Sequence, residues 1–277
     1  MKITLNNLAI AKNTYQKRWK EATRIKSSLA RCLLAEFFST ALLRFIGTGG
    51  MVGYVVGSYN ILHVNIIWGL AITSAVYPSY LITGGHVNPA ITAIIYFHGY
   101  VSFFHAILYM IVQILGAMLG AALSYANHRE IILFYGNGTL SAVGEPTSTG
   151  NIFASFPGEH LSNSGAFVDQ MIGTGLLGVF IGFFCEKKNK ISTVMQPLLY
   201  GLVATMISIS YGINMGAPVN PATDFGSRSF AAMVGYGSEM FSAYDYFFWI
   251  PIVGPMVGGI LGAAIYRIFI GHHLPDE

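Results

Sequence analysis

No formally charged residue occurs from residue 45 to residue 128, a run of 84 positions between Arg44 and Arg129. A membrane-spanning helix needs about 20 mostly apolar residues, so this run is long enough for more than two crossings. Over all 277 residues, only 10% are charged, whereas a soluble domain has about 25%. The sequence therefore excludes a soluble enzyme, a nucleic-acid-binding protein and a disordered chain.

Turn signals rich in glycine, asparagine and histidine divide the apolar sequence into six segments. The six expected spans are about 33–57, 63–84, 100–124, 166–185, 192–214 and 244–266. The sequence thus predicts an all-α polytopic membrane protein. We expect one membrane domain over residues 32–270, between an N-terminal tail over 1–31 and a C-terminal segment over 271–277.

The distribution of basic residues predicts the orientation in the membrane. Eight of the 15 Lys and Arg residues lie between Lys2 and Arg31, and three more, Lys187, Lys188 and Lys190, lie between the fourth and fifth spans. Because cytosolic connections are enriched in Lys and Arg, both termini are expected in the cytosol.

The segment 125–165 is then extracellular, and its sequon at Asn137 is a candidate glycosylation site. The two cysteines, Cys32 and Cys185, do not have the spacing of metal ligands and are expected to pack near the membrane ends. No cofactor, metal or catalytic residue is expected.

An internal repeat relates the two halves of the membrane domain. Aligning Gly69 with Gly201 gives eight identities in 22 positions, ending in Asn-Pro-Ala in both halves. The repeats span about 32–124 and 166–268. Each contains three spans, an odd number, so the second must enter the membrane from the opposite side, which makes the repeat inverted.

Two Asn-Pro-Ala boxes follow the second and fifth spans. Asparagine is a favoured helix N-cap and proline a favoured first helical residue, so each box predicts a helix start. A helix from Asn88 to about Gly99 is about 15 Å long, half of the hydrocarbon core. The sequence therefore predicts two re-entrant half-helices that meet near the midplane. The box residues are Asn88, Pro89, Ala90, Asn220, Pro221 and Ala222.

The facing half-helices have electrostatic consequences. Each helix N-terminus is equivalent to about half a positive charge, so two of them repel cations. The irregular backbone before each helix is tolerated at this depth only where it lines a water-filled cavity, which implies a pore. The carbonyl groups expected to line it are those of Gly84, Gly85, His86, Met215 and Gly216.

On these motifs, the chain over residues 30–275 resembles the aquaporin, or major intrinsic protein, family. Ala35-Glu36-Phe-Phe, Asn220-Pro-Ala-Thr-Asp224 and the end around Tyr266-Arg267 resemble its aquaglyceroporin branch. The resemblance implies a passive channel without catalytic activity for water and small uncharged solutes such as glycerol. It also implies a homotetramer in a lipid bilayer, and we expect this bilayer to be the plasma membrane.

Matched to the family, the selectivity filter of this chain departs from the common pattern. The four matching positions are Trp68, Ser208, Ala217 and Thr223. Most members have Arg where this chain has Thr223, and glycerol channels usually have an aromatic residue where it has Ala217. Arg228 lies five residues further along the half-helix, too far round to replace that Arg. We therefore expect a wide filter that lacks the usual Arg.

Several polar residues are expected to support the loops before the half-helices. By resemblance, Glu36 holds the first loop by accepting backbone N–H bonds, and its repeat partner is Gln170. Asp224 is assigned a similar supporting role. Arg44 has no recognised counterpart in the family and is expected to serve packing or the membrane interface.

Alternatives to a water and glycerol channel remain open at this stage. A channel for other neutral solutes, such as urea, larger polyols, protonated lactic acid or metalloids, fits the same motifs. A coupled solute transporter shares inverted repeats and broken helices, but the boxes place no titratable residue at the midplane. A scaffold protein with a closed pore is the third alternative.

Overall fold

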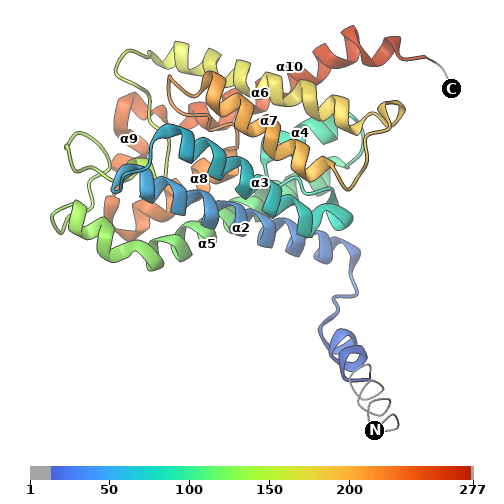
Figure 1. The fold of residues 1–277 in the computed structure, drawn as a ribbon, viewed down its shortest axis with the longest axis horizontal. Helices are drawn as coiled ribbons and strands as arrows, with labels where there is room; N and C mark the ends of the chain where they lie inside the picture. Colours follow the sequence, from blue (N-terminus) through green and yellow to red (C-terminus); the bar gives the residue numbers. More distant parts are fainter. Residues whose placement is uncertain (1–13, 276–277) are drawn as a thin grey trace.

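The architecture is a bundle of helices, described for residues 14–275 by a computed structural model (Figure 1). Its six long helices are α2 (Ser28–Val55), α3 (Ile61–Thr83), α5 (Phe103–Tyr135), α6 (Asn163–Cys185), α7 (Gln196–Tyr211) and α10 (Ile250–Phe269). Two short helices, α4 (Pro89–Phe97) and α8 (Pro221–Ala231), lie between the long ones in opposite halves of the bundle. The predicted all-α fold is confirmed.

Four helical segments of the described chain are long and apolar enough to cross a membrane. They are α3, α5, α6 and the run Glu239–His273, which contains α9 (Glu239–Tyr246) and α10. Of the other two long helices, α2 carries three charged residues, and α7 has only 16 residues. The start of α2 and the end of α10 lie at the same end of the bundle (Figure 1).

Polar caps explain where several helices begin. The side chain of Ser27 accepts a hydrogen bond from the Ala30 N–H at the start of α2. Asn60 and His63 form a reciprocal capping box at the start of α3. Because these caps satisfy N–H groups that have no partner inside the helix, they fix the helix ends. Helix α2 therefore starts at Ser28, within the tail expected over 1–31, of which residues 1–13 lie outside the described residues.

The third span is longer than predicted, and the connection that follows it, which was expected to be extracellular, is correspondingly shorter. Helix α5 continues past Ser124 to Tyr135, where Gly136 caps it. The polar residues that suggested a loop, such as Asn127 and Arg129, lie on the exposed side of this extension. Its other side buries Tyr125 and Ile132 in an apolar cluster. The burial of these apolar side chains at helical spacing therefore determines the structure here, in spite of the polar residues between them. The connection from α5 to α6 covers 136–162 rather than 125–165.

Two further boundaries differ from the sequence prediction. The fifth span is shorter, since α7 covers Gln196–Tyr211 instead of 192–214. The last span begins at Ile250 rather than near Tyr244, because residues 244–246 have positive φ angles of 53° to 59° that interrupt the helix. Such left-handed conformations are uncommon for residues other than glycine.

Equivalent helix pairs in the two repeats pack through glycine. A Cβ atom at Gly116 or Gly120 of α5 would overlap main-chain oxygens of α2, and one at Gly178 of α6 would overlap a main-chain oxygen of α10. Helices α3 and α7 meet at Gly69 and Gly201, where each glycine faces the carbonyl oxygen of the other. Residues paired by the sequence repeat therefore touch in space.

Replacing Gly69 by alanine tests this crossing. The new Cβ would overlap the Thr205 side chain and the Gly201 carbonyl, and overpacking of this kind costs about 1–3 kcal/mol. We expect Gly69→Ala to lower the melting temperature in detergent by several degrees. In the control Gly49→Ala, the nearest atom to the new Cβ is 3.8 Å away, so that variant should melt no lower than the wild type. Equal melting of all three proteins would contradict the tight crossing.

Candidate functional site: two half-helices and a pore

The two half-helices begin at the Asn-Pro-Ala boxes with the same capping geometry. Asn88 Oδ1 accepts a hydrogen bond from the Ala90 N–H at 2.8 Å. Asn220 Oδ1 accepts from the N–H groups of Ala222 and Thr223 at 3.1 and 3.3 Å. Each box proline occupies the first turn, where its missing N–H leaves no hydrogen bond unmade.

Reciprocal hydrogen bonds join the tips of the half-helices. Asn88 Nδ2 donates to the Val219 carbonyl at 2.9 Å, and Asn220 Nδ2 donates to the Val87 carbonyl at 2.8 Å. An Asn amide nitrogen carries two hydrogens, so each retains a second donor besides the one used here. The six box residues thus form one cross-linked unit in which two helix N-termini face each other.

The loop before the first half-helix is held by the buried carboxylate of Glu36. Its two oxygens accept from the N–H groups of His86 and Val87 at 3.0 and 2.8 Å, and from the side chains of Thr83 and Gln113. Val87 has a φ angle of 45°, an uncommon conformation for a β-branched residue. Bonds at both its N–H and its carbonyl fix this conformation.

Gln170 does not support the second loop as its repeat partner Glu36 supports the first, so that expectation is corrected. Its Nε2 donates to Asp169 Oδ2 at 3.0 Å, and its Oε1 makes no hydrogen bond within the described part of the chain. The Val219 N–H, which such a group would bind, donates instead to the Ala217 carbonyl at 2.8 Å. The neighbouring Asp169 takes over part of this role by accepting from Asn214 Nδ2 at 2.6 Å.

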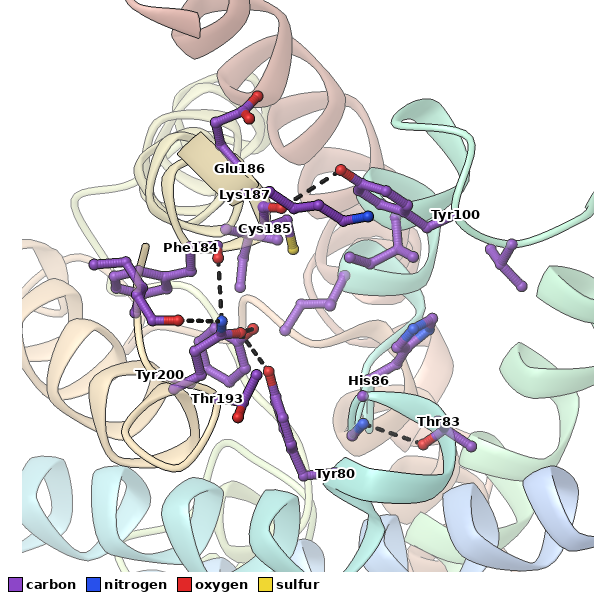
Figure 2. Close-up of a pocket in the computed structure, with 18 of the residues that line it drawn as sticks. Tyr80, Thr83, His86, Tyr100, Phe184, Cys185, Glu186, Lys187, Thr193 and Tyr200 are labelled. Carbon is purple, nitrogen blue, oxygen red and sulfur yellow. Dashed lines mark hydrogen bonds between the residues drawn. The ribbon is translucent and has the colours of Figure 1, made fainter. Parts of the chain in front are cut away.

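A cavity of about 590 Å³ opens at the end of the bundle where α2 begins (Figure 2). We call it the tail-side cavity. The predicted pore-lining residues Gly84, Gly85 and His86 contribute to its wall. Tyr80 and Tyr200 extend towards each other from α3 and α7, and both hydroxyls donate to Gln196 Oε1, at 2.6 and 2.9 Å.

A second cavity, of about 650 Å³, lies at the opposite end of α3, and we call it the loop-side cavity. It is lined by all four residues matched to the selectivity filter, Trp68, Ser208, Ala217 and Thr223. The predicted pore residues Met215 and Gly216 line it too, as does Asn220. The boxes therefore lie between two cavities, and each cavity is lined by one of the two predicted sets of pore residues.

Asp224 supports a different segment from the one expected. Its Oδ2 accepts from the Ser155 N–H at 2.8 Å, and its Oδ1 forms an ion pair with Arg228 Nε at 2.7 Å. Arg228 also donates to the carbonyls of Ser155 and Met240. The pair thus anchors the connection between α5 and α6 to α8. Arg228 does not line the loop-side cavity, so it does not take the place of the Arg that the resemblance to the family would put at position 223.

Arg44 was not predicted as a site residue, yet it lines the loop-side cavity. Its Nη2 donates to the carbonyls of Ile152 and Phe153 at 3.0 and 2.8 Å, and its guanidinium carbon lies 5.4 Å from the centre of the Trp68 ring. The available signal in the sequence was its place as the one charged residue between Glu36 and Arg129, because ionisable groups inside membrane helices are usually functional.

The remaining expected positions lie away from the boxes. Asn137 is exposed in the connection that follows α5. Cys32 and Cys185 are both unpaired and half-buried. Among the residues that the structure describes, no group of three or more His, Cys, Asp and Glu side chains is placed to bind a metal ion.

Comparison with known proteins identifies the family. Residues 22–266 match the family model "Major intrinsic protein". Human Aquaporin-9 is 34% identical over 264 residues, covering 94% of this chain and 89% of that protein. Aquaporin-10 of Milnesium tardigradum is 36% identical over 274 residues, covering 93% and 66%.

A solved structure supports the fold. The X-ray structure of the aquaglyceroporin from Plasmodium falciparum superposes with a TM-score of 0.79 at 24% identity, covering 87% of this chain and 97% of that one. With two half-helices joined tip to tip, two cavities and these relatives, the chain belongs to the major intrinsic protein family of membrane channels.

Proposed function

We propose that this protein is a passive channel for water and small uncharged solutes such as glycerol, with a selectivity filter formed by Trp68, Ser208, Ala217 and Thr223. The observation that carries the proposal is the pair of box asparagines between the two cavities. Their spare amide hydrogens can bind a passing hydroxyl group, and the facing helix N-termini disfavour cations. Trp68 offers an apolar wall to the carbon backbone of a polyol.

We infer that both termini are cytosolic and that the protein resides in the plasma membrane. Lys187 and Lys190 line the tail-side cavity, at the same end as the start of α2, and basic residues favour the cytosolic side. Asn137 would then be extracellular and available for glycosylation. A homotetramer with one pore per subunit is proposed from the resemblance to the family.

Vesicle swelling tests the channel function. Purified protein in liposomes should accelerate both water efflux and the glycerol-driven reswelling that follows, with a rate linear in the glycerol gradient. A coupled transporter would instead saturate and follow an ion gradient. Glycerol reswelling no faster than in empty liposomes would remove glycerol from the proposal. If neither water efflux nor glycerol reswelling were accelerated, the water and glycerol channel would be overturned, and a swelling assay with urea and larger polyols would separate a channel for other solutes from a closed scaffold.

Thr223→Arg tests the width of the filter. An arginine here would narrow the loop-side cavity beside Ala217, and the steric loss grows with solute width. We expect uptake of larger polyols to fall several-fold, glycerol less and water least, in a swelling assay normalised to the protein inserted. Ala217→Phe should act in the same direction. An unchanged solute range in correctly inserted Thr223→Arg would place the constriction elsewhere.

Asn220→Asp tests the electrostatic barrier. The Asp carboxylate would face the Val87 carbonyl without a hydrogen to donate, and a buried charge costs roughly 2.5–3.5 kcal/mol on translocon scales. We expect poor expression, together with a cation leak in the fraction that inserts. The matched control Asn127→Asp, on the exposed side of α5, should behave as the wild type. If Asn220→Asp is expressed normally and its liposomes show no cation leak, the proposed role of Asn220 in excluding cations is contradicted.

A further inference from the structure

Two charged residues line the loop-side cavity, Asp224 and Arg44, and within the described part of the chain Arg44 is the one that makes no ion pair. Asp224 lines this cavity, but its carboxylate is paired with Arg228 at 2.7 Å. Arg44 lines the same cavity and makes no ion pair among the described residues. Because a guanidinium stays protonated in proteins, Arg44 adds a full positive charge to the cavity wall.

Arg44 lies at the depth of the proposed filter in the membrane, and not at the depth of the Asn-Pro-Ala boxes. Glu36, which binds the loop next to Asn88, and Arg44 lie on the same helix, α2, eight residues apart. At 1.5 Å per residue, this separation corresponds to about 12 Å. Arg44 therefore lies well beyond the box asparagines, beside Trp68, whose ring its guanidinium faces.

The guanidinium of Arg44 is held in place by hydrogen bonds, but not all of its N–H groups take part in them. Only 5% of Arg44 is exposed, and two carbonyls of the segment before α6 bind its Nη2. Its Nε is buried and makes no hydrogen bond within the described part of the chain. Gly47, one turn further along α2, has no side chain, and the Trp68 ring occupies that space. Arg44 and Trp68 thus lie side by side in the wall of the cavity that Thr223 also lines.

We propose that Arg44 is a specificity-determining residue of this channel and supplies the cation of the selectivity filter in place of the Arg absent at position 223. The proposal rests on the channel function proposed above. The charge reaches the filter from α2 instead of from the re-entrant segment. This arrangement repels cations while leaving the space at Thr223 and Ala217 open to wider neutral solutes.

Removal and relocation of the charge test the proposal. In liposomes, Arg44→Gln should raise K⁺ leak by about tenfold or more, since a unit charge at short range dominates the local barrier. The double variant Arg44→Gln/Thr223→Arg should restore cation exclusion, because it returns a positive charge to the same cavity at position 223. Arg129→Gln, which removes an exposed charge from α5, is the matched control and should remain cation-tight.

A purely structural role for Arg44 gives different results. If it only anchors Ile152 and Phe153, Arg44→Gln should lose stability and all flux without K⁺ leak, and Thr223→Arg should not restore either property. If Arg44→Gln fails to insert into liposomes, the variant Arg44→Lys separates the two roles. Lysine keeps the positive charge but lacks the planar guanidinium that binds the carbonyls of Ile152 and Phe153. Cation-tight, conducting Arg44→Lys supports the proposal, and a non-conducting or leaky one overturns it.

The wild-type control separates this proposal from the channel function. Glycerol flux through the wild type together with a cation-tight, conducting Arg44→Gln overturns the role of Arg44 alone. Absence of flux through the wild type overturns both.

Discussion

The pore depends on how the backbone of Val87 is held. Its N–H donates to the buried carboxylate of Glu36, and its carbonyl accepts from Asn220 of the opposite half-helix. In hydrocarbon, each backbone group left unpaired costs several kcal/mol, so an irregular loop needs internal partners. A carboxylate on α2 thereby fixes the first loop, and that loop in turn fixes the tip of the second half-helix.

The inverted repeat provides symmetric contacts where the two halves meet and different ones elsewhere. Asn88 and Asn220 make equivalent bonds to Val219 and Val87, because residues near a two-fold axis face their own counterparts. Away from this axis the halves differ, as Glu36 has a neutral partner in Gln170. The second loop is consequently closed by its own backbone and by Asp169.

Much of this structure could be predicted from the sequence, for physical reasons that act locally. Asn-Pro-Ala specifies a helix start by capping alone, and the spacing of glycines specifies close helix contacts. The extension of α5 could not be predicted, because its polar surface residues resemble a loop until the partners of Tyr125 and Ile132 are known. Nor could the bonds of Asp224, whose partner Ser155 lies 69 positions away.

The position of Arg44 illustrates where sequence comparison reaches its limit. Matching positions one by one finds that Thr223 lacks a charge but cannot find a charge that enters the same cavity from another helix. A buried guanidinium is expensive unless it is hydrogen-bonded, and in the described part of the chain two carbonyls, an aromatic ring and the nearby Asp224 carboxylate partly offset that expense for Arg44. Methionine would fill much of the same volume without a charge to desolvate. A charge retained under those conditions, in the wall of the cavity that Thr223 also lines, is better explained by its effect on permeating solutes than by packing.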